Sequence, residues 1–390
     1  MDLLSPVVFN DEWGSHIAIA SLQGRPIPSV LPESELWMGA HESGPSELTR
    51  DGVTGTLAEV IAADPTSELG ARGAARFGDR LPFLLKILAP GRAISIQVHP
   101  SAEQVRQLRE LDPETEVYVD DWAKPELLLA VSPFEVFIGM RPVDEVAELI
   151  EVLGVEHLRD LLTASRHAAD PLHALLTAIL TVPSTEQREL VRSVVAACVE
   201  DEGSDHPSVH ACSAIAAIAE DHPDDIGLVV LLLMNHRILR PGDYVDVPAG
   251  VLHSYVRGVG VEVLANSDNV VRAGLTHKEV NVVELLRIVD TAADGRVGRA
   301  QVGSDGTEYF VSSSDRFQLY RLRPTVRRAL PGDENGPRIA FCLRGSVTLT
   351  GASGELRLGP TGSAYLRAGE GSVHAEGAGE LYVVAVTGPL

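Results

Sequence analysis

The first part of the chain carries apolar runs that are typical of buried β-strands. The segments "PFLLKILA" (82–89), "AISIQVHP" (93–100) and "PELLLAVSPFEVFIGM" (125–140) are rich in apolar and β-branched residues, which favours strands. Residues two apart in a strand share a face, so Lys86 should lie beside Leu84 and Leu88 on one face. We therefore expect strands and loops through residues 1–142.

From Val143 the hydrophobic period changes. The segment "VDEVAELIEVLGVEHLRDLL" (143–162) has apolar residues at i, i+3, i+4 and i+7, which predicts amphipathic helices. The same pattern continues to about Met234, and β-type sequence resumes at "HRILRPGDYVDVPAG" (236–250). We therefore expect an α-helical domain inserted between two parts of a β-domain.

The last part of the chain, from about Ser312, is a series of short apolar segments separated by glycine-rich turns. Such a series predicts a β-sandwich or barrel, and 390 residues exceed one ordinary core. The predicted division is a mainly β protein with an inserted helical domain, with boundaries at 1–142, 143–234, 235–311 and 312–390.

Composition narrows the possible partners and the compartment. The formal charge of −23 argues against nucleic acid or an anionic membrane, which attract basic surfaces. The cysteines lack metal or disulfide spacing, and the longest wholly apolar run, Leu228 to Met234, cannot span a bilayer. No apolar, basic segment of the signal-peptide type opens the sequence, so we expect a cytoplasmic protein. We also expect a monomer.

One motif predicts a metal site. The pattern G-x5-P-x-G-x2-H in "GDYVDVPAGVLH" places His253 on a second strand after a tight turn. A single inward histidine of this kind is how cupin barrels hold a metal, and Gln97, His99 and Glu126 lie upstream. Two imidazoles, one carboxylate and one amide oxygen suit zinc. We expect one Zn²⁺ per chain. Because Gln97 is a neutral ligand, the bound ion would keep a net positive charge, which favours Lewis-acid chemistry.

Two further features favour a catalytic site. The chain has only three lysines, Lys86, Lys124 and Lys278, against 29 arginines. A lysine that is kept in such a background indicates a position that requires a compact ammonium group. The segment "VEVLANSDNVVRAGLTHK" (261–278) gathers Glu262, Asp268 and Arg272. Such a polar segment belongs either to a site or to a capped loop, because Asn, Ser and Asp also form turns.

The order of these motifs resembles type I mannose-6-phosphate isomerase (phosphomannose isomerase). The resemblance covers nearly the whole chain. It implies zinc held by Gln97, His99, Glu126 and His253, with Arg272 as an active-site arginine. It also implies a cupin jelly-roll core and a C-terminal cupin, which here is degenerate because Val373 stands where the motif has histidine. The segments that carry it are "WGS" (13–15), "ELWMGAH" (35–41), "PFLLK" (82–86), "SIQVHP" (95–100), "KPE" (124–126), "PAGVLHSY" (248–255) and "SDNVVRAGLT" (267–276).

The resemblance implies interconversion of mannose 6-phosphate and fructose 6-phosphate through a cis-enediol(ate), in mannose metabolism and the supply of GDP-mannose precursors. Such chemistry needs a tuned base and a polarised carbonyl. An anionic substrate also needs a locally positive pocket, which Lys86, Lys124 and Arg272 can supply. Ser95 is a candidate hydrogen-bond donor to the substrate, and Tyr255 shares the inward face of His253.

Two positions depart from the family pattern. The family has the pattern N-H-K-P-E, which ends at the carboxylate ligand, whereas this chain has Ala123 at the histidine position. The second departure is His277, which stands where proline is usual and is either a loop replacement or a pocket residue. Loss of the histidine leaves open whether Glu262, Asp268 or Lys124 carries the proton. The alternative hypothesis is a non-catalytic or weakly active sugar-phosphate-binding cupin. An iron-dependent cupin oxygenase is disfavoured because Gln97 replaces the first histidine of H-x-H.

Overall fold

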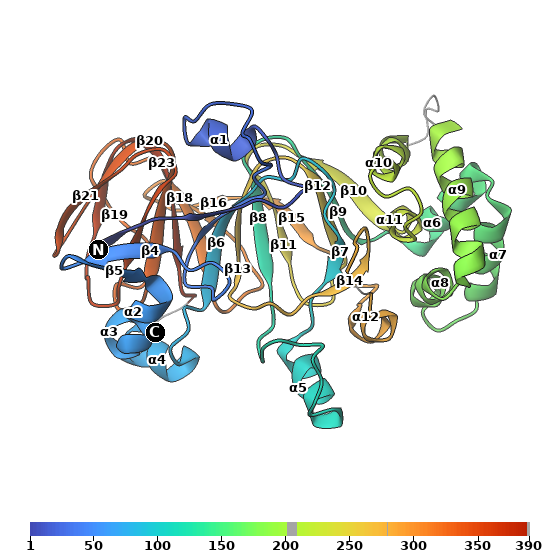
Figure 1. Cartoon of the computed structure of the whole chain (residues 1–390), viewed down its shortest axis with the longest axis horizontal. Helices are drawn as coiled ribbons and strands as arrows, with labels where there is room; N and C mark the ends of the chain where they lie inside the picture. The colour runs from blue at the N-terminus through green and yellow to red at the C-terminus, as the bar shows by residue number, and fades with distance from the viewer. Residues whose placement is uncertain (201–208, 279, 388–390) are drawn as a thin grey trace.

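The computed structural model describes residues 1–200, 209–278 and 280–387 of the chain. The protein is mainly β with several helices, and its parts form an elongated row (Figure 1). A helical cluster lies at one end, two sheets stand in the middle, and a third large sheet lies at the end that holds the N-terminus. Among the described residues no helix has the length and apolar character needed to cross a membrane.

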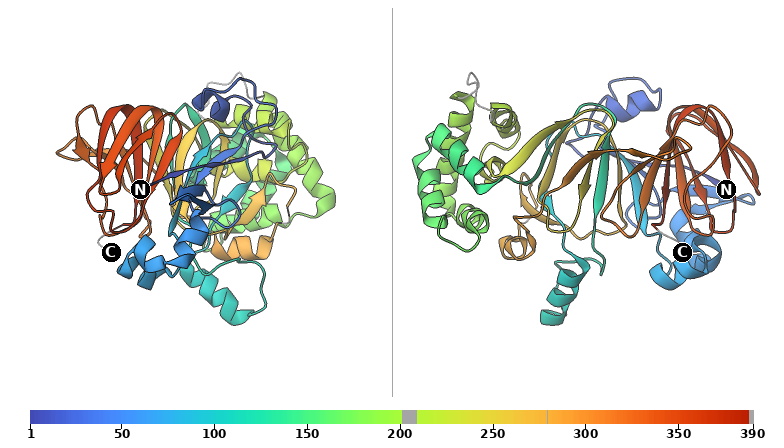
Figure 2. Two further views of the ribbon diagram at one scale, coloured as in Figure 1. Left: turned by 60° about the vertical axis from the view of Figure 1, so that its left-hand side comes forward. Right: turned by 180° about the vertical axis from the view of Figure 1, so that it is seen from behind.

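Two facing sheets make up the middle of the molecule (Figures 1 and 2). The first has the strand order β15-β11-β8-β13-β6-β3-β2, and the second has the order β10-β9-β12-β7-β14. Their apolar inner faces share one core that includes Leu128, Val136 and Val245. The strands of the first sheet are β2 (Val7–Phe9), β3 (Glu35–Met38), β6 (Phe83–Leu88), β8 (Glu126–Ala130), β11 (Asp243–Val247), β13 (Gly260–Ala265) and β15 (Arg296–Arg299). Those of the second are β7 (Ile96–Val98), β9 (Phe134–Met140), β10 (Met234–Leu239), β12 (His253–Arg257) and β14 (Val271–Gly274).

Side chains alternate between the two faces of these strands, as a period of two requires. In β6, Leu85 and Ile87 pack outward with the C-terminal sheet, whereas Lys86 and Leu88 face the other sheet of the pair. Lys86 is therefore a buried cation in a strand whose residues are all buried. The predicted placement of Lys86 beside Leu88 is confirmed.

Helices cover the outer face of the five-stranded sheet, and their core includes Val98 and Phe137 from that sheet. In the described part of the chain between β9 and β10 there are six of them, which agrees with the helical segment predicted from the period of 3.6 residues. They are α6 (Val143–Leu153), α7 (Glu156–Ser165), α8 (Pro171–Leu180), α9 (Ser184–Glu200), α10 (Val209–Ala219) and α11 (Gly227–Leu232). A further helix, α12 (Val282–Ile288), follows β14.

A nine-stranded antiparallel sheet packs on the outer face of the seven-stranded sheet, and one buried core includes Phe341 and Tyr382 from the first and Leu85 and Val263 from the second. Its strands include the N-terminal β1 and two strands that precede residue 312, so the sheet is not confined to 312–390. The strands are β1 (Asp2–Leu4), β16 (Gln301–Val302), β17 (Glu308–Phe310), β18 (Gln318–Leu322), β19 (Arg328–Ala329), β20 (Arg338–Gly351), β21 (Gly354–Leu358), β22 (Gly362–Leu366) and β23 (His374–Ala385).

Helices in the first 142 residues correct the expectation that this part holds only strands and loops. Capping boxes mark two of them, Thr56 with Glu59 and Ser101 with Gln104, and this local signal was present in the sequence. The helices are α1 (Ala18–Leu22), α2 (Leu57–Ala63), α3 (Pro65–Leu69), α4 (Ala71–Phe77) and α5 (Ala102–Leu111); β4 (Glu47–Arg50) and β5 (Val53–Thr56) form a separate hairpin.

Candidate metal centre and active site

Three metal-ligand side chains from distant parts of the chain converge between the two central sheets. Glu126 opens β8 of one sheet, His253 opens β12 of the other, and His99 directly follows β7. His99 Nε2 lies 3.1 Å from Glu126 Oε1, and His253 Nε2 lies 3.4 Å from Glu126 Oε2. The three ligand atoms lie within 4.8 Å of one another and all three residues are buried.

Hydrogen bonds behind the two histidines fix which nitrogen faces the centre. The Nδ1 of His99 donates to the Asn269 carbonyl at 2.8 Å, and the Nδ1 of His253 donates to the Val251 carbonyl at 3.1 Å. Each neutral ring therefore presents a bare Nε2 lone pair to Glu126. The Nε2 of His99 is buried without a hydrogen-bond partner. Three electron-pair donors facing one point repel one another unless a cation lies between them, so this donor set fits a metal.

The protonation states of the centre agree with that fit. Burial lowers the pKa of His99 to about 4, so the ring is neutral at physiological pH. Burial alone would raise the pKa of Glu126, but the Lys124 ammonium beside it acts in the opposite direction and favours the ionised carboxylate. A neutral imidazole and an ionised carboxylate are the forms that bind a metal.

Strand register explains why the motif residues meet. In the sheet, Gln97 of β7 is paired with His253 of β12 on one side and with Arg272 of β14 on the other. Gly250, in the turn before β12, has φ +84° and donates its backbone N–H to the His99 carbonyl at 2.9 Å. That backbone conformation is strained for other residues, which explains the glycine at this place in the motif. The hydrogen bond holds the turn against His99, a candidate metal ligand.

A cavity of about 600 Å³ lies beside the centre and reaches the surface of the protein. All the residues predicted for the site line it except His99, which is buried behind it. The lining residues include Lys86, Ser95, Gln97, Lys124, Glu126, His253, Tyr255, Glu262, Asp268 and Arg272. The structure therefore brings the predicted residues together at one open site.

Lys86 forms ion pairs on this wall with two acidic residues. Its Nζ lies 3.3 Å from Glu35 Oε1 and 3.5 Å from Glu262 Oε2. Burial opposes the ammonium charge, but the surrounding carboxylates raise the pKa of Lys86. Burial raises the pKa of Glu262 to about 7, against the lowering effect of Lys86. Glu35 was missed by the sequence analysis, although the alternation in "ELWM" placed it two residues from Trp37 on the same face.

Two further cations lie near the centre. Lys124 Nζ is 3.5 Å from Glu126 Oε1. Arg272 is half-buried, burial lowers its pKa, and no described carboxylate forms an ion pair with it. A desolvated guanidinium without a counter-ion is suited to an anionic ligand.

Two polar groups complete the lining near Gln97. The Gln97 Nε2 donates to Ser95 Oγ at 3.1 Å, which leaves the amide oxygen of Gln97 available as a ligand. Tyr255 packs against His253, with ring centroids 5.6 Å apart, and its buried hydroxyl lacks a hydrogen-bond partner. Burial raises the pKa of Tyr255 well above its usual value, so the hydroxyl keeps its proton as a donor.

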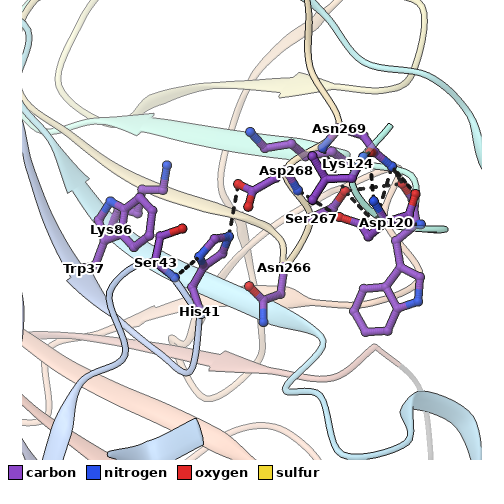
Figure 3. Close-up of polar contacts among 12 residues, drawn as sticks. Trp37, His41, Ser43, Lys86, Asp120, Lys124, Asn266, Ser267, Asp268 and Asn269 are labelled. Atoms are coloured by element: carbon purple, nitrogen blue, oxygen red, sulfur yellow. Dashed lines mark hydrogen bonds and ion pairs between the residues drawn. The ribbon is translucent and has the colours of Figure 1, made fainter. Parts of the chain in front are cut away.

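Asn269 has a supporting role that the sequence analysis did not assign. It is fully buried, and its side chain donates to the Asp120 and Trp122 carbonyls and accepts the N–H groups of Val119 and Asp120. Its own carbonyl accepts from His99. The side chain of Asn269 therefore holds the segment that leads into Lys124 (Figure 3), and its backbone carbonyl holds His99 of the candidate metal centre.

His277 lies in the loop after β14 and also lines the cavity. Its ring lies 6.4 Å from that of His222, which also lines the cavity and comes from the segment between α10 and α11. The helical part of the chain thus contributes to the wall of the cavity. Sequence spacing could not show this, because the two positions are 55 residues apart.

Comparisons with known proteins agree with this geometry. Residues 1–143 match the family model of the phosphomannose isomerase type I catalytic domain. The mannose-6-phosphate isomerases of Salmonella typhimurium and Escherichia coli are each 32% identical over 392 residues, with 98% of both chains covered.

Solved structures show the same similarity. A mutant of phosphomannose isomerase from Salmonella typhimurium superposes with a TM-score of 0.89 at 31% identity, covering 99% of both chains. A zinc-bound mannose 6-phosphate isomerase superposes with a TM-score of 0.87 at 30% identity, again covering 99% of both chains. Similarity of this extent over the full length shows that the chain belongs to the type I phosphomannose isomerase family.

Proposed function

We propose that the protein is a zinc-dependent aldose–ketose isomerase that interconverts mannose 6-phosphate and fructose 6-phosphate through a cis-enediol(ate). The observation that carries the proposal is the convergence of the His99, Glu126 and His253 ligand atoms within 4.8 Å, beside an open cavity. In metabolism such an enzyme links mannose to the supply of GDP-mannose precursors.

The metal ligands in this proposal are Gln97, His99, Glu126 and His253, holding one Zn²⁺ per chain. Support comes from the bare Nε2 of His99 and from the free amide oxygen of Gln97. When bound, zinc supplies Lewis-acid polarisation of the sugar carbonyl.

The proposed substrate contacts follow from charge. Arg272 has no carboxylate partner among the described residues and is the cation best placed for the phosphate. Lys86 and Lys124 add positive charge to a cavity that belongs to a chain of net charge −23. Ser95 and Tyr255 supply hydroxyl groups for the sugar. These contacts orient the substrate and displace water from the reacting carbons.

The proton-transfer step requires a group that can both take up and release a proton near neutral pH. The sequence left Glu262, Asp268 and Lys124 as candidates. The pKa of Glu262, about 7, is close to the operating pH, which favours it as the proton carrier between C1 and C2. Lys86 forms an ion pair with Glu262 and stabilises its ionised form.

A pH profile tests the assignment of Glu262. The carboxylate must be ionised to accept the C2 proton, so kcat/KM should fall as pH drops below about 7 and Glu262 becomes protonated. Glu262→Gln should lose nearly all turnover at every pH and should keep its zinc. Wild-type-like turnover in the Gln variant would exclude Glu262 as the base.

The direct test of the proposed function is a coupled assay. Purified protein loaded with zinc should convert mannose 6-phosphate to fructose 6-phosphate, and much less glucose 6-phosphate or free mannose should react. Removal of zinc by a chelator should stop turnover, and added zinc should restore it. Binding of mannose 6-phosphate with no turnover by the zinc-loaded protein would instead support the non-catalytic alternative raised by Ala123.

The finer description of the fold is also a proposal. We infer that the two central sheets form a cupin jelly roll, interrupted by a helical domain, with a metal-free cupin-like domain at the C-terminal end. The division at 1–142, 143–234, 235–311 and 312–390 keeps the ligands in the two parts of the first cupin. The expected partner is a sugar phosphate rather than nucleic acid or a membrane, and the expected state is a cytoplasmic monomer.

A further inference from the structure

His41 contacts a carboxylate at the edge of the cavity. It follows β3, is buried, and its Nε2 lies 3.2 Å from Asp268 Oδ1 (Figure 3). Asp268 lines the cavity, and its side chain is 48% exposed. His41 itself does not line the cavity, so any effect on a ligand passes through Asp268.

The tautomer of His41 is fixed by the surrounding residues. Its Nδ1 accepts the backbone N–H of Ser43 at 3.1 Å, so the proton of the neutral ring is on Nε2. Nε2 is also the ring nitrogen that lies 3.2 Å from Asp268 Oδ1. Trp37 packs edge-on against the imidazole, with ring centroids 5.0 Å apart, and holds the ring in this orientation.

The Asp268 carboxylate is held as an ionised acceptor. The hydrogen bond from His41 lowers the pKa of Asp268, and the charges of Lys124 and Lys86 act in the same direction. From the other side Asp120 accepts the backbone N–H of Asp268 at 3.0 Å. His41 contacts Oδ1, and within the described ranges no residue forms a hydrogen bond or ion pair with Oδ2.

We propose that His41 is a positioning residue for sugar recognition, orienting Asp268 so that its free oxygen accepts a hydrogen bond from a hydroxyl of the bound sugar phosphate. The proposal rests on the proposed isomerase function. Position 123, where the family pattern has histidine, is alanine in this chain. Among the described residues, His41 is the imidazole that contacts Asp268.

The test compares two substitutions at one position. Gln keeps an N–H donor near the place of Nε2, whereas Leu fills similar space without a donor. Mannitol 6-phosphate is the binding probe, because it keeps all the hydroxyls but has no carbonyl to react. His41→Leu should raise its Kd and the KM for mannose 6-phosphate roughly 10-fold, the loss expected for a hydrogen bond to a charged group. His41→Gln should restore both values to within about 3-fold of wild type.

A double-mutant cycle separates positioning from a structural role. If His41 acts through Asp268, the Kd of the double variant His41→Leu/Asp268→Asn should equal that of Asp268→Asn alone. As the pH falls, binding by His41→Leu should also weaken sooner, at a higher pH, than binding by the wild type. The reason is that the pKa of Asp268 rises when its donor is lost, so the carboxylate is protonated at a higher pH. Zinc content should be unchanged.

Three results would overturn the proposal. They are an unchanged Kd in His41→Leu, full additivity in the cycle, or equal loss of binding in both variants together with a lower melting temperature. Calorimetry with mannitol 6-phosphate does not depend on turnover. A protein that binds the probe but does not isomerise mannose 6-phosphate would therefore contradict the proposed function and leave the His41 result interpretable.

Discussion

His253→Ala should lose zinc and turnover together. The substitution removes one of the ligand atoms that face Glu126 and leaves an opening where the imidazole was buried. Changes that only affect residues behind a metal ligand cost about 10–100-fold in affinity or activity. Loss of a ligand itself should therefore lower kcat/KM by on the order of 10³-fold or more at a fixed zinc concentration. Zinc content by atomic absorption and the coupled assay measure the two effects.

His374→Ala is the matched control, because this histidine opens β23 in the C-terminal sheet and does not line the cavity. It should keep wild-type zinc content and rate. High zinc should partly rescue His253→Ala if the remaining ligands still hold the ion weakly. Full activity in a His253→Ala preparation that contains no metal would contradict the proposed Lewis-acid role.

Arg272→Ala should keep zinc but lose most of its turnover. The guanidinium is half-buried without an anionic partner, so its charge is available to the substrate phosphate. Removing one such contact costs about 2–4 kcal/mol, or roughly 30- to 1,000-fold in kcat/KM. Steady-state kinetics with mannose 6-phosphate measure the loss. The loss should be much smaller for a substrate without phosphate, which has no anion for the arginine to bind.

Arg92→Ala provides the comparison for Arg272. Arg92 also lines the cavity, but it is 61% exposed and its Nη1 lies 3.4 Å from Asp221 Oδ1. An exposed and already paired arginine contributes little, so Arg92→Ala should change kcat/KM by less than about 5-fold. Equal losses in the two variants would show that general positive charge in the cavity matters, and not the specific place of Arg272.

Much of the site could be predicted because its residues lie on strands. The alternation of side chains in β6, β7 and β12 determines that Lys86, Gln97 and His253 point inward. The order of the motifs along the chain, which resembles that of the type I family, also indicates the candidate ligand set. The helical segment from Val143 was predicted because its apolar period extends over many turns.

The missed features depend on contacts between distant segments. Nothing near His41 in the chain indicates that it contacts Asp268, more than 200 residues later. Likewise, the hydrogen bonds of Asn269 to residues 119–122 follow from how two loops pack, and a buried asparagine cannot be distinguished by sequence from one in a turn. The N-terminal strand β1 joins the C-terminal sheet for the same reason, since pairing between chain ends leaves no local pattern.

The facing lone pairs of His99, Glu126 and His253 also have a consequence for folding. Buried acceptors that repel one another make the metal-free native state less stable than its packing alone would allow. A cation that binds only the folded chain shifts the folding equilibrium by about 2.7 kcal/mol at a free concentration 100 times its dissociation constant. The amount of folded protein in a cell should therefore follow the supply of zinc, and metal starvation should lower the abundance of the protein as well as its activity.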